Sequence, residues 1–314
     1  MYSPRMTSRP ALLIMQRHLA PLTAFLEGTY DVYRFWEGPP VEAAHDIRAL
    51  VVAGEFPLDK HLIESLPNLS LIACFTSGYD GIDVDWCRAR GLPVTHAPGV
   101  NHEDVADHAI GLVLAARRGI AAGDRALRAG AWTPDSKLIT PSLKDQRLGV
   151  VGLGAIGEAV ARRAQALRMP VQWWGPRDKA ADWPRAASLL DLARDNDILV
   201  VACRADESNR GLISKAVIEA LGPQGLLVNV ARGQLVDETA LIAALKDGRL
   251  GQAALDVFED EPTDPARWAD VPNTVLTPHT GGATTEAVQG MLVLLMQNLQ
   301  AAFADEPLKT PVPD

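Results

Sequence analysis

Cysteine is scarce in this chain, and the three that occur lie far apart. Cys74, Cys87 and Cys203 form no C-x-x-C pair, and no histidine stands at a spacing typical of a zinc site. A disulfide framework and a bound metal are therefore not expected. The simplest interpretation is that these are reduced thiols in a cytoplasmic protein.

Clusters of basic residues are also missing. The chain has 30 Lys and Arg against 39 Asp and Glu, a formal net charge of −9 at pH 7. Nucleic acids and anionic membrane surfaces attract concentrated positive charge, which this sequence does not offer. We expect neither as a partner.

No apolar run is long enough to cross a bilayer, which takes about 20 predominantly apolar residues. The nearest candidate, GMLVLLMQNLQAAF, lies close to the C-terminus and is interrupted by Gln and Asn. It is predicted to be an amphipathic helix. Short-period repeats and low-complexity tracts are absent as well, so an ordinary globular protein is expected.

The chain does contain two series of alternating strand and helix patterns. In the first, β-rich runs such as ALLIM and RALVVAG alternate with helix-like stretches, and in the second DILVVAC, GLLVNVA and NTVLTP do so. Such alternation predicts βαβ units and parallel sheets. A length of 314 residues favours two domains. We expect boundaries that give segments 1–98, 99–282 and 283–314, the last being a helix that returns to the first domain.

A long helix is expected over about 104–130. Its middle, DHAIGLVLAARRGI, is apolar on nearly every side. A helix of this kind is buried against something large, and a second subunit would serve. The sequence therefore predicts a homodimer formed through this helix.

The most specific local pattern is RLGVVGLGAIG, in which a short buried strand runs into three glycines and then a helix. In dinucleotide sites the first glycine makes a tight turn, the second lets the backbone approach a pyrophosphate, and the third allows close packing of helix and strand. The helix start offers N–H groups to the phosphates. A plain structural turn is the alternative. The residues expected to bind the cofactor here are Gly152, Gly154, Ala155, Ile156 and Gly157.

Four motifs in a fixed order resemble those of the D-2-hydroxyacid dehydrogenase family: VGLGAIG, VNVARGQLVDETAL, ALDVFEDEP and LTPHTGGAT. The wording is most similar to that of the NADP-dependent hydroxypyruvate/glyoxylate and hydroxyphenylpyruvate reductases. The resemblance implies an α/β fold of two doubly wound parallel-sheet domains. A Rossmann dinucleotide-binding domain, 99–282, would be inserted in a flavodoxin-like substrate domain.

The resemblance also implies catalytic roles for Arg232, Glu261 and His279. Taken singly, each has a simpler interpretation: an arginine that caps a loop, a solvated carboxylate and a packed histidine. The fork of Arg232 suits the carboxylate of a 2-oxo acid. Glu261 would keep His279 protonated, so that the imidazolium can donate a proton to the substrate oxygen as hydride reaches the 2-oxo carbon.

Residues of the first domain are assigned to the substrate by the same resemblance. Backbone N–H groups of Ser77, Gly78 and Tyr79, in TSGYDG, would hold the substrate carboxylate together with Arg232, and Gly54 matches a second substrate loop. A glycine turn that simply closes a strand is the alternative.

Cofactor choice depends on the end of the strand VQWW. Gly175 stands where NAD-preferring members carry Asp, and Arg177 could accept a 2′-phosphate, whereas Asp178 would repel it. We expect NADP(H) to be preferred over NAD(H). The other residues that the resemblance, or nearness in the sequence, assigns to the cofactor are Cys203, Arg204, Ala231 and Asp256.

The function expected from these observations is reduction of a small 2-oxo acid, of hydroxypyruvate or glyoxylate type, to the D-2-hydroxy acid. An NAD(H)-sensing corepressor and a phosphite dehydrogenase remain alternatives, the latter because it shares the Arg, Glu and His pattern. Glu261 argues against a formate dehydrogenase. His96 and His108 are expected to pack, and Trp132 either packs or crosses a dimer to line the partner's site.

Overall fold

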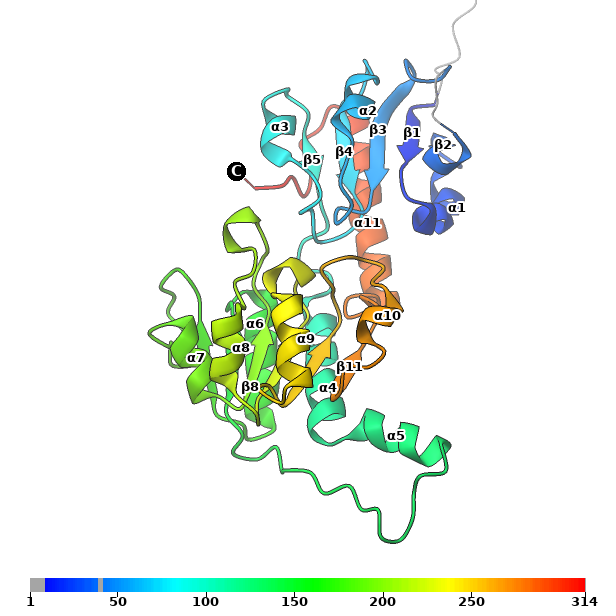
Figure 1. The fold of residues 1–314 in the computed structure, drawn as a ribbon. Helices are drawn as coiled ribbons and strands as arrows, with labels where there is room; N and C mark the ends of the chain where they lie inside the picture. Colours follow the sequence, from blue (N-terminus) through cyan, green and yellow to red (C-terminus); the bar gives the residue numbers. More distant parts are fainter. Residues whose placement is uncertain (1–8, 39–41, 314) are drawn as a thin grey trace, which may run out of the picture. The chain divides into compact units, whose positions relative to one another are not determined.

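The computed structural model describes residues 9–38 and 42–313, which divide into two compact units. Unit 1 comprises 1–100 and 285–314, and unit 2 comprises 101–284 (Figure 1). Each boundary lies two residues beyond the expected one. No helix within the described residues is long and apolar enough to cross a membrane.

Unit 1 contains a five-stranded parallel sheet with the order β2-β1-β3-β4-β5. This is the order of flavodoxin-like sheets, in which the chain winds outward from β1 in both directions. Helices cover both faces of this sheet, and the apolar side chains along β1 and β4 are therefore buried throughout. The strands are β1 (Ala11–Ile14), β2 (Asp31–Arg34), β3 (Ile47–Val52), β4 (Leu71–Cys74) and β5 (Val94–Thr95). The helical segments are η1 (Arg17–Leu22), α1 (Thr23–Leu26), η2 (Phe35–Glu37), α2 (Lys60–Glu64), α3 (Val84–Arg88) and α11 (Thr285–Phe303).

The C-terminal helix α11 packs on the sheet of unit 1 although it follows unit 2 in the sequence. Ala287, Met291, Leu295 and Leu299 recur every four residues, and all four are buried against one face of that sheet. Four-residue spacing places these side chains on one stripe of the helix. The apolar C-terminal stretch is thus the amphipathic helix that its pattern predicts.

Unit 2 contains a six-stranded parallel sheet with the order β11-β10-β9-β8-β6-β7. Alternate residues of each central strand point to opposite faces, where α4 and α6 cover one face and α7, α8 and α9 the other. The expected α/β class with two parallel sheets is confirmed. The strands are β6 (Leu148–Val151), β7 (Val171–Trp174), β8 (Ile198–Val201), β9 (Leu226–Asn229), β10 (Gln252–Leu255) and β11 (Thr274–Leu276). The helical segments are α4 (His102–Arg117), α5 (Ile120–Arg128), α6 (Ala155–Ala166), α7 (Leu189–Asp195), η3 (Glu207–Asn209), α8 (Lys215–Leu221), η4 (Gly233–Leu235), α9 (Glu238–Lys246) and α10 (Pro265–Trp268).

The strand order of unit 2 reverses at β6, which has β7 on one side and β8 on the other. Open α/β sheets bind their ligands at such a switch point, beyond the carboxyl ends of the strands. The three-glycine turn follows β6 directly. The fold therefore places the glycine motif where a ligand is expected.

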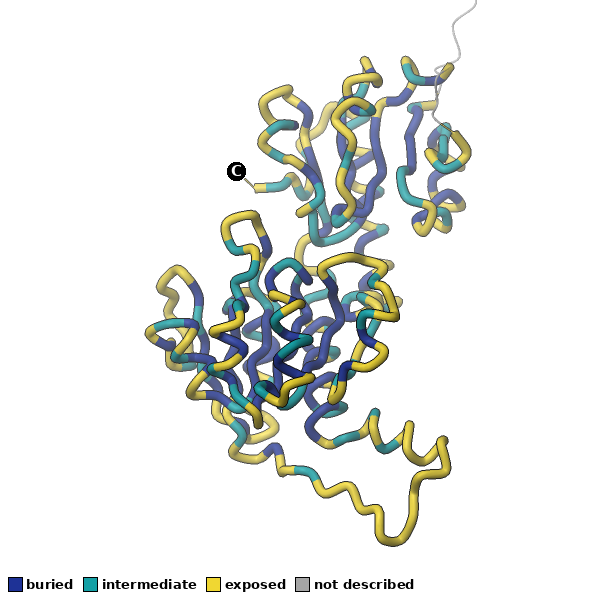
Figure 2. The backbone as a smooth tube through the Cα atoms, in the orientation of Figure 1, coloured by how far each residue is buried: buried dark blue, intermediate teal, exposed yellow. Residues whose placement is uncertain are grey.

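The expected single helix over 104–130 is wrong. Helix α4 ends at Arg117, Gly119 adopts the left-handed conformation with φ 62°, and α5 begins at Ile120. Only α4 is buried: α5 has no buried residue, and α5 and the segment that follows it run away from the packed body of unit 2 (Figures 1 and 2). The apolar pattern continues across the break, but a glycine with positive φ interrupts the helix there.

Candidate active site

The three glycines after β6 form a turn with room for a ligand at its tip. A Cβ added to Gly152, whose φ is 91°, would lie 2.5 Å from the Cβ of Cys203, and one added to Gly157 would lie 2.0 Å from the carbonyl oxygen of Gly152. A Cβ at Gly154 would meet no atom within 4 Å. Helix α6 begins at Ala155 with no side-chain cap, so its first N–H groups point into that space. The turn is packed where the motif needs packing and open where a pyrophosphate would approach, which fits a dinucleotide.

Cys203 and Arg204 follow β8, next to this turn. Burial raises the pKa of the Cys203 thiol to about 11, so the side chain is a neutral wall behind Gly152. Arg204 is exposed, and its carbonyl oxygen accepts a hydrogen bond from Asn209 at 2.8 Å. Arg177 is exposed in the turn after β7. Contact of these residues with the ribose and phosphates of a dinucleotide stays a prediction from the sequence.

Asp256, at the end of β10, is only 2% exposed and accepts several hydrogen bonds. Its Oδ1 accepts from the Thr277 hydroxyl at 2.6 Å and from the Thr280 N–H at 2.9 Å, while Oδ2 accepts from the Gly281 N–H at 2.8 Å. His108 of α4 lies 3.2 Å from Oδ1. Burial alone would raise the pKa of Asp256, but these hydrogen bonds outweigh it and the pKa lies below its ordinary value.

His108 does more than pack, in contrast to the expectation from the sequence. Its Nε2 lies 2.9 Å from the Thr277 hydroxyl, so it joins Asp256 in holding the end of β11. The sequence signal was weak, because a histidine in an apolar helix usually reads as a core residue. Its partner Thr277 lies 169 positions away in the chain.

His279 occupies the loop that Asp256 holds. Its φ of 52° lies in the left-handed region, which costs a residue with a side chain of order 1 kcal/mol or more. The His279 N–H donates to the carbonyl oxygen of Asp256 at 2.7 Å, and the neighbouring Thr280 N–H donates to the Asp256 side chain. Asp256 therefore fixes the backbone on both sides of the imidazole.

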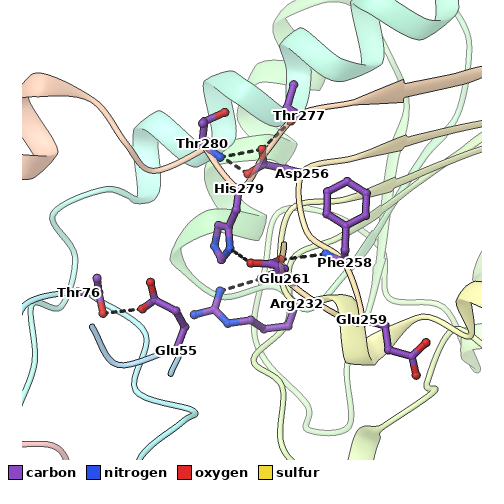
Figure 3. Close-up of polar contacts among 12 residues, drawn as sticks. Glu55, Thr76, Arg232, Asp256, Phe258, Glu259, Glu261, Thr277, His279 and Thr280 are labelled. Atoms are coloured by element: carbon purple, nitrogen blue, oxygen red, sulfur yellow. Dashed lines mark hydrogen bonds and ion pairs between the residues drawn. The ribbon is translucent and has the colours of Figure 1, made fainter. Parts of the chain in front are cut away.

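Glu261 and His279 form a hydrogen-bonded pair, with 2.6 Å between Glu261 Oε2 and His279 Nδ1. The other carboxylate oxygen of Glu261 accepts from the Phe258 N–H at 2.9 Å, which orients it. The hydrogen bond that His279 donates to the Glu261 carboxylate raises the pKa of His279 above its ordinary value of 6.5, although burial and Arg232 oppose the shift. Figure 3 shows the imidazole facing Glu261, with the guanidinium of Arg232 on the same side.

Arg232 begins the turn η4 that follows β9. Asn229 holds this turn: its Oδ1 accepts from the Ala231 N–H at 3.0 Å, and its Nδ2 donates to the Arg232 carbonyl oxygen at 2.9 Å. The Arg232 guanidinium donates to the Ala231 carbonyl oxygen at 2.8 Å. A Cβ at Gly233 would lie 1.8 Å from the backbone of Phe258, so the loops carrying Arg232 and Glu261 are in direct contact.

Two supporting residues escaped the sequence reasoning. Asn229 is 1% exposed, and a polar residue within the apolar run GLLVNVA was the available signal. Glu238, at the start of α9, is 2% exposed and accepts from the Glu259 N–H at 2.5 Å, while Arg267 lies 3.3 Å from its other oxygen. Burial raises the pKa of Glu238. The partners of Asn229 lie two and three residues further along the chain, whereas those of Glu238 lie more than 20 residues away and could not be found from local spacing.

In unit 1, the predicted substrate loops lie at the carboxyl ends of β3 and β4. A Cβ at Gly54 would lie 2.2 Å from the Gly78 carbonyl oxygen, so the two loops touch, and the Gly54 N–H is already donated to the Thr76 hydroxyl at 2.8 Å. The Ser77 hydroxyl donates to the Ala97 carbonyl oxygen at 2.6 Å. Gly54 thus allows close packing rather than offering its own N–H.

His96 supports the same loops from β5. Its Nδ1 lies 3.0 Å from the Ser77 carbonyl oxygen, and its ring meets that of Tyr79 edge to face at 4.9 Å. The Thr76 hydroxyl also lies 3.1 Å from a Glu55 carboxylate oxygen. These contacts agree with the structural role expected for His96, which stays a prediction.

The described residues include no group of three or more His, Cys, Asp or Glu that could hold a metal ion. The structure brings Arg232, Glu261 and His279 together from three separate loops.

Comparison with known proteins gives a consistent result. Residues 110–281 match the family model described as D-isomer specific 2-hydroxyacid dehydrogenase, NAD binding domain. The chain is 40% identical over 304 residues to glyoxylate/hydroxypyruvate reductase A of Arabidopsis thaliana, covering 94% of this chain and 97% of that protein. Identity and coverage are the same for hydroxyphenylpyruvate reductase of Plectranthus scutellarioides. A solved structure of NADPH-dependent glyoxylate/hydroxypyruvate reductase from Sinorhizobium meliloti, in complex with NADP and malonate, matches with a TM-score of 0.89 at 34% identity, covering 97% of each chain.

Proposed function

This chain belongs to the D-isomer specific 2-hydroxyacid dehydrogenase family, and from that premise we propose that it reduces glyoxylate or hydroxypyruvate with NADPH. Membership makes it an NAD(P)-dependent 2-oxoacid reductase. The observation that carries the proposed reduction is the 2.6 Å contact between Glu261 and His279, beside a loop that presents Arg232. The choice of glyoxylate or hydroxypyruvate and of NADPH is supported by the relatives.

His279 is the proposed proton donor. Because its Nδ1 faces Glu261, Nε2 is left to protonate the oxygen of a substrate carbonyl. The raised pKa favours the protonated imidazole, the form that can supply the proton that reduction needs. A bound nicotinamide supplies the hydride. Product formation then leaves a neutral imidazole, which solvent reprotonates.

Arg232 is proposed to bind the carboxylate of the 2-oxo acid and to polarise its carbonyl. A guanidinium offers two parallel donors, which match a carboxylate in geometry and charge. Asn229 fixes the loop, so the fork is positioned before substrate arrives. The loop of Ser77, Gly78 and Tyr79 in unit 1, with Gly54 packed against it, is proposed to bind a substrate carboxylate through backbone N–H groups.

NADP(H) is proposed as the preferred cofactor. Gly175 offers no carboxylate to the ribose, and Arg177 is exposed at the end of β7. The relative from Sinorhizobium meliloti is described as NADPH-dependent. The other proposed contacts are the turn from Gly152 to Gly157, together with Cys203, Arg204, Ala231 and Asp256.

We further propose a cytoplasmic homodimer. The three cysteines are free, as expected in a reducing compartment. Apolar side chains are exposed along α5 and the segment after it, including Trp132 at 71% and Ile139 at 90%. Exposed apolar surface of this extent is typical of an interface. A second subunit packed against α4 and α5 would cover it.

The test is nicotinamide absorbance with a panel of substrates. Glyoxylate, hydroxypyruvate, hydroxyphenylpyruvate and phosphite are each assayed with the matching reduced or oxidised cofactor, in NAD and NADP forms. Turnover of glyoxylate or hydroxypyruvate with a higher kcat/KM for NADPH supports the proposal. Tight cofactor binding without turnover would instead indicate a sensor, and phosphite oxidation alone would indicate a phosphite dehydrogenase.

A further inference from the structure

A short segment after β7 returns to the edge of the unit 2 sheet and lies parallel to β7 there. The Trp173 N–H donates to the Pro184 carbonyl oxygen at 3.1 Å, and the Ala186 N–H donates to the Trp173 carbonyl oxygen at 2.8 Å. Trp173 and Arg185 thereby form a parallel β-bridge on β7, the edge strand. These hydrogen bonds fix the backbone of Arg185 beside β7. The turn that follows β7, from Gly175 to Asp178, is the one proposed to select the cofactor.

The Arg185 guanidinium clamps that turn at two points. Its Nη1 lies 2.5 Å from Asp178 Oδ1, and its Nη2 donates to the Gly175 carbonyl oxygen at 2.6 Å. The guanidinium carbon stands 5.7 Å from the centroid of the Trp173 ring. The Arg185 side chain is 33% exposed and that of Asp178 is 91% exposed. A single planar fork therefore spans the turn from its first residue to its fourth.

Two consequences follow for a phosphate at this turn. Asp178, the residue that the sequence sets against NADP(H), has its negative charge paired. Arg177 lies between the two clamped residues, is exposed, and pairs with no carboxylate among the residues described. Its guanidinium is therefore available to an anion.

The same turn is tied to the glycine loop. The Lys179 ammonium donates to the Leu153 carbonyl oxygen at 2.8 Å and also pairs with Glu158 of α6. Leu153 lies between the first two glycines of the motif. Lys179 thus binds the turn to the proposed pyrophosphate loop, while Arg185 binds it to the sheet edge, so the position of Arg177 is set from both sides.

We propose that Arg185 is a specificity-determining residue that permits NADP(H) binding: it neutralises Asp178 and holds the turn so that Arg177 meets the 2′-phosphate. Arg185 is a positioning residue in this role. The inference rests on the proposed preference for NADP(H). Without Arg185, the Asp178 carboxylate would be unpaired, one residue from the guanidinium proposed to bind the phosphate. The carboxylate and the phosphate are both negative, and like charges a few ångströms apart repel each other strongly near a protein surface.

The test measures the dissociation constants of NADP⁺ and NAD⁺ by calorimetry, on the full chain and without turnover. Arg185→Met is expected to weaken NADP⁺ binding about tenfold and to change NAD⁺ binding less than about twofold, since only NADP⁺ carries the phosphate. Adding Asp178→Asn to that variant is expected to recover most of the loss. Arg194→Met, which breaks an exposed Arg194–Asp191 pair of 3.1 Å on α7, is the matched control and is expected to leave both constants unchanged.

Equal weakening of NADP⁺ and NAD⁺ by Arg185→Met, or no weakening, would overturn the inference. The Asp178→Asn single variant tests it even if Arg185→Met does not fold. Removing an already neutralised carboxylate is expected to tighten NADP⁺ binding less than about twofold, and a gain of about tenfold would show that Arg185 does not neutralise it. If the wild-type protein prefers NAD⁺, the cofactor proposal fails, but the change in the NADP⁺ to NAD⁺ ratio still decides the role of Arg185.

Discussion

At the scale of residues, the proposed catalytic groups are held by buried polar side chains that bind backbone rather than substrate. Asp256 holds the loop of His279, and Asn229 holds the loop of Arg232. Preorganisation of this kind lets a site stabilise charge without moving at the moment of reaction. The proposed chemistry thus depends on residues that do not take part in it.

The first prediction concerns Glu261 and pH. In the wild-type protein the pKa of His279 is raised, so kcat/KM for reduction should stay high until pH exceeds that raised value and then fall as the imidazole loses its proton. Glu261→Gln removes the hydrogen-bonded charge, while burial and Arg232 still lower the pKa. The fall should therefore begin at lower pH, which a pH profile of kcat/KM measures. An unchanged profile would remove Glu261 from this role.

The second prediction concerns Asn229. Asn229→Ala leaves the Ala231 N–H and the Arg232 carbonyl oxygen without their partner, which should cost about 1–3 kcal/mol of unfolding free energy. It should also raise KM for the 2-oxo acid, because the Arg232 loop is released. Asn196→Ala is the matched control: Asn196 is buried and donates to the Leu192 carbonyl oxygen away from the site. If both variants change KM equally, Asn229 has no specific role.

The sequence predicts Arg232, Glu261 and His279 but not the residues that hold them. The three follow strand ends and belong to motifs that can be read locally. Asn229 appears in the sequence as one polar residue in a strand, although its partners are only two and three residues away. His108 appears as a core histidine, because Thr277 is brought near it only by the fold. Asp178 is the sharpest case: the sequence suggests repulsion of a phosphate, whereas Arg185 neutralises it.

At the scale of elements, the turn between β6 and α6 was predictable and the break after α4 was not. The glycine turn is specified by a strand, three glycines and a helix within one short stretch. The apolar pattern of α4 continues into α5, so periodicity alone predicts one helix. A single glycine at 119 ends it, and one glycine within an apolar run is a weak signal.

The third prediction separates two glycines of that turn. Gly154→Ala should fold with an unchanged Tm, because the added Cβ meets no atom within 4 Å, but should weaken NADP⁺ binding, because it fills the space proposed for the pyrophosphate. Gly157→Ala should lower the Tm, since its Cβ would lie 2.0 Å from a backbone oxygen. Thermal unfolding and calorimetry measure both effects. Unaltered NADP⁺ affinity in Gly154→Ala would contradict the proposed site.

At the scale of the whole molecule, exposed apolar side chains along α5 and the segment after it are what the proposed dimer would cover. Ile120, Leu127 and Trp132 are each more than half exposed. Large exposed apolar groups promote association or aggregation of a monomer. Among the described residues, α5 thus has no buried side chain.

The fourth prediction is that the protein has twice the 33.8 kDa chain mass in solution, as measured by light scattering after gel filtration. Leu127→Glu should shift it towards the monomer. Val293→Glu places the same charge on an exposed apolar position of α11 and should leave the mass unchanged. A monomeric wild-type protein would contradict the proposed dimer.

The most direct test of the central claim is the rate of hydroxypyruvate reduction by His279→Ala. Loss of a positioned proton donor should lower kcat by about 10²-fold or more, while the dissociation constant of NADP⁺ stays within about twofold of the wild-type value. Near-normal turnover in this variant, at the pH where the wild-type enzyme is active, would contradict the assignment of His279 as the proton donor.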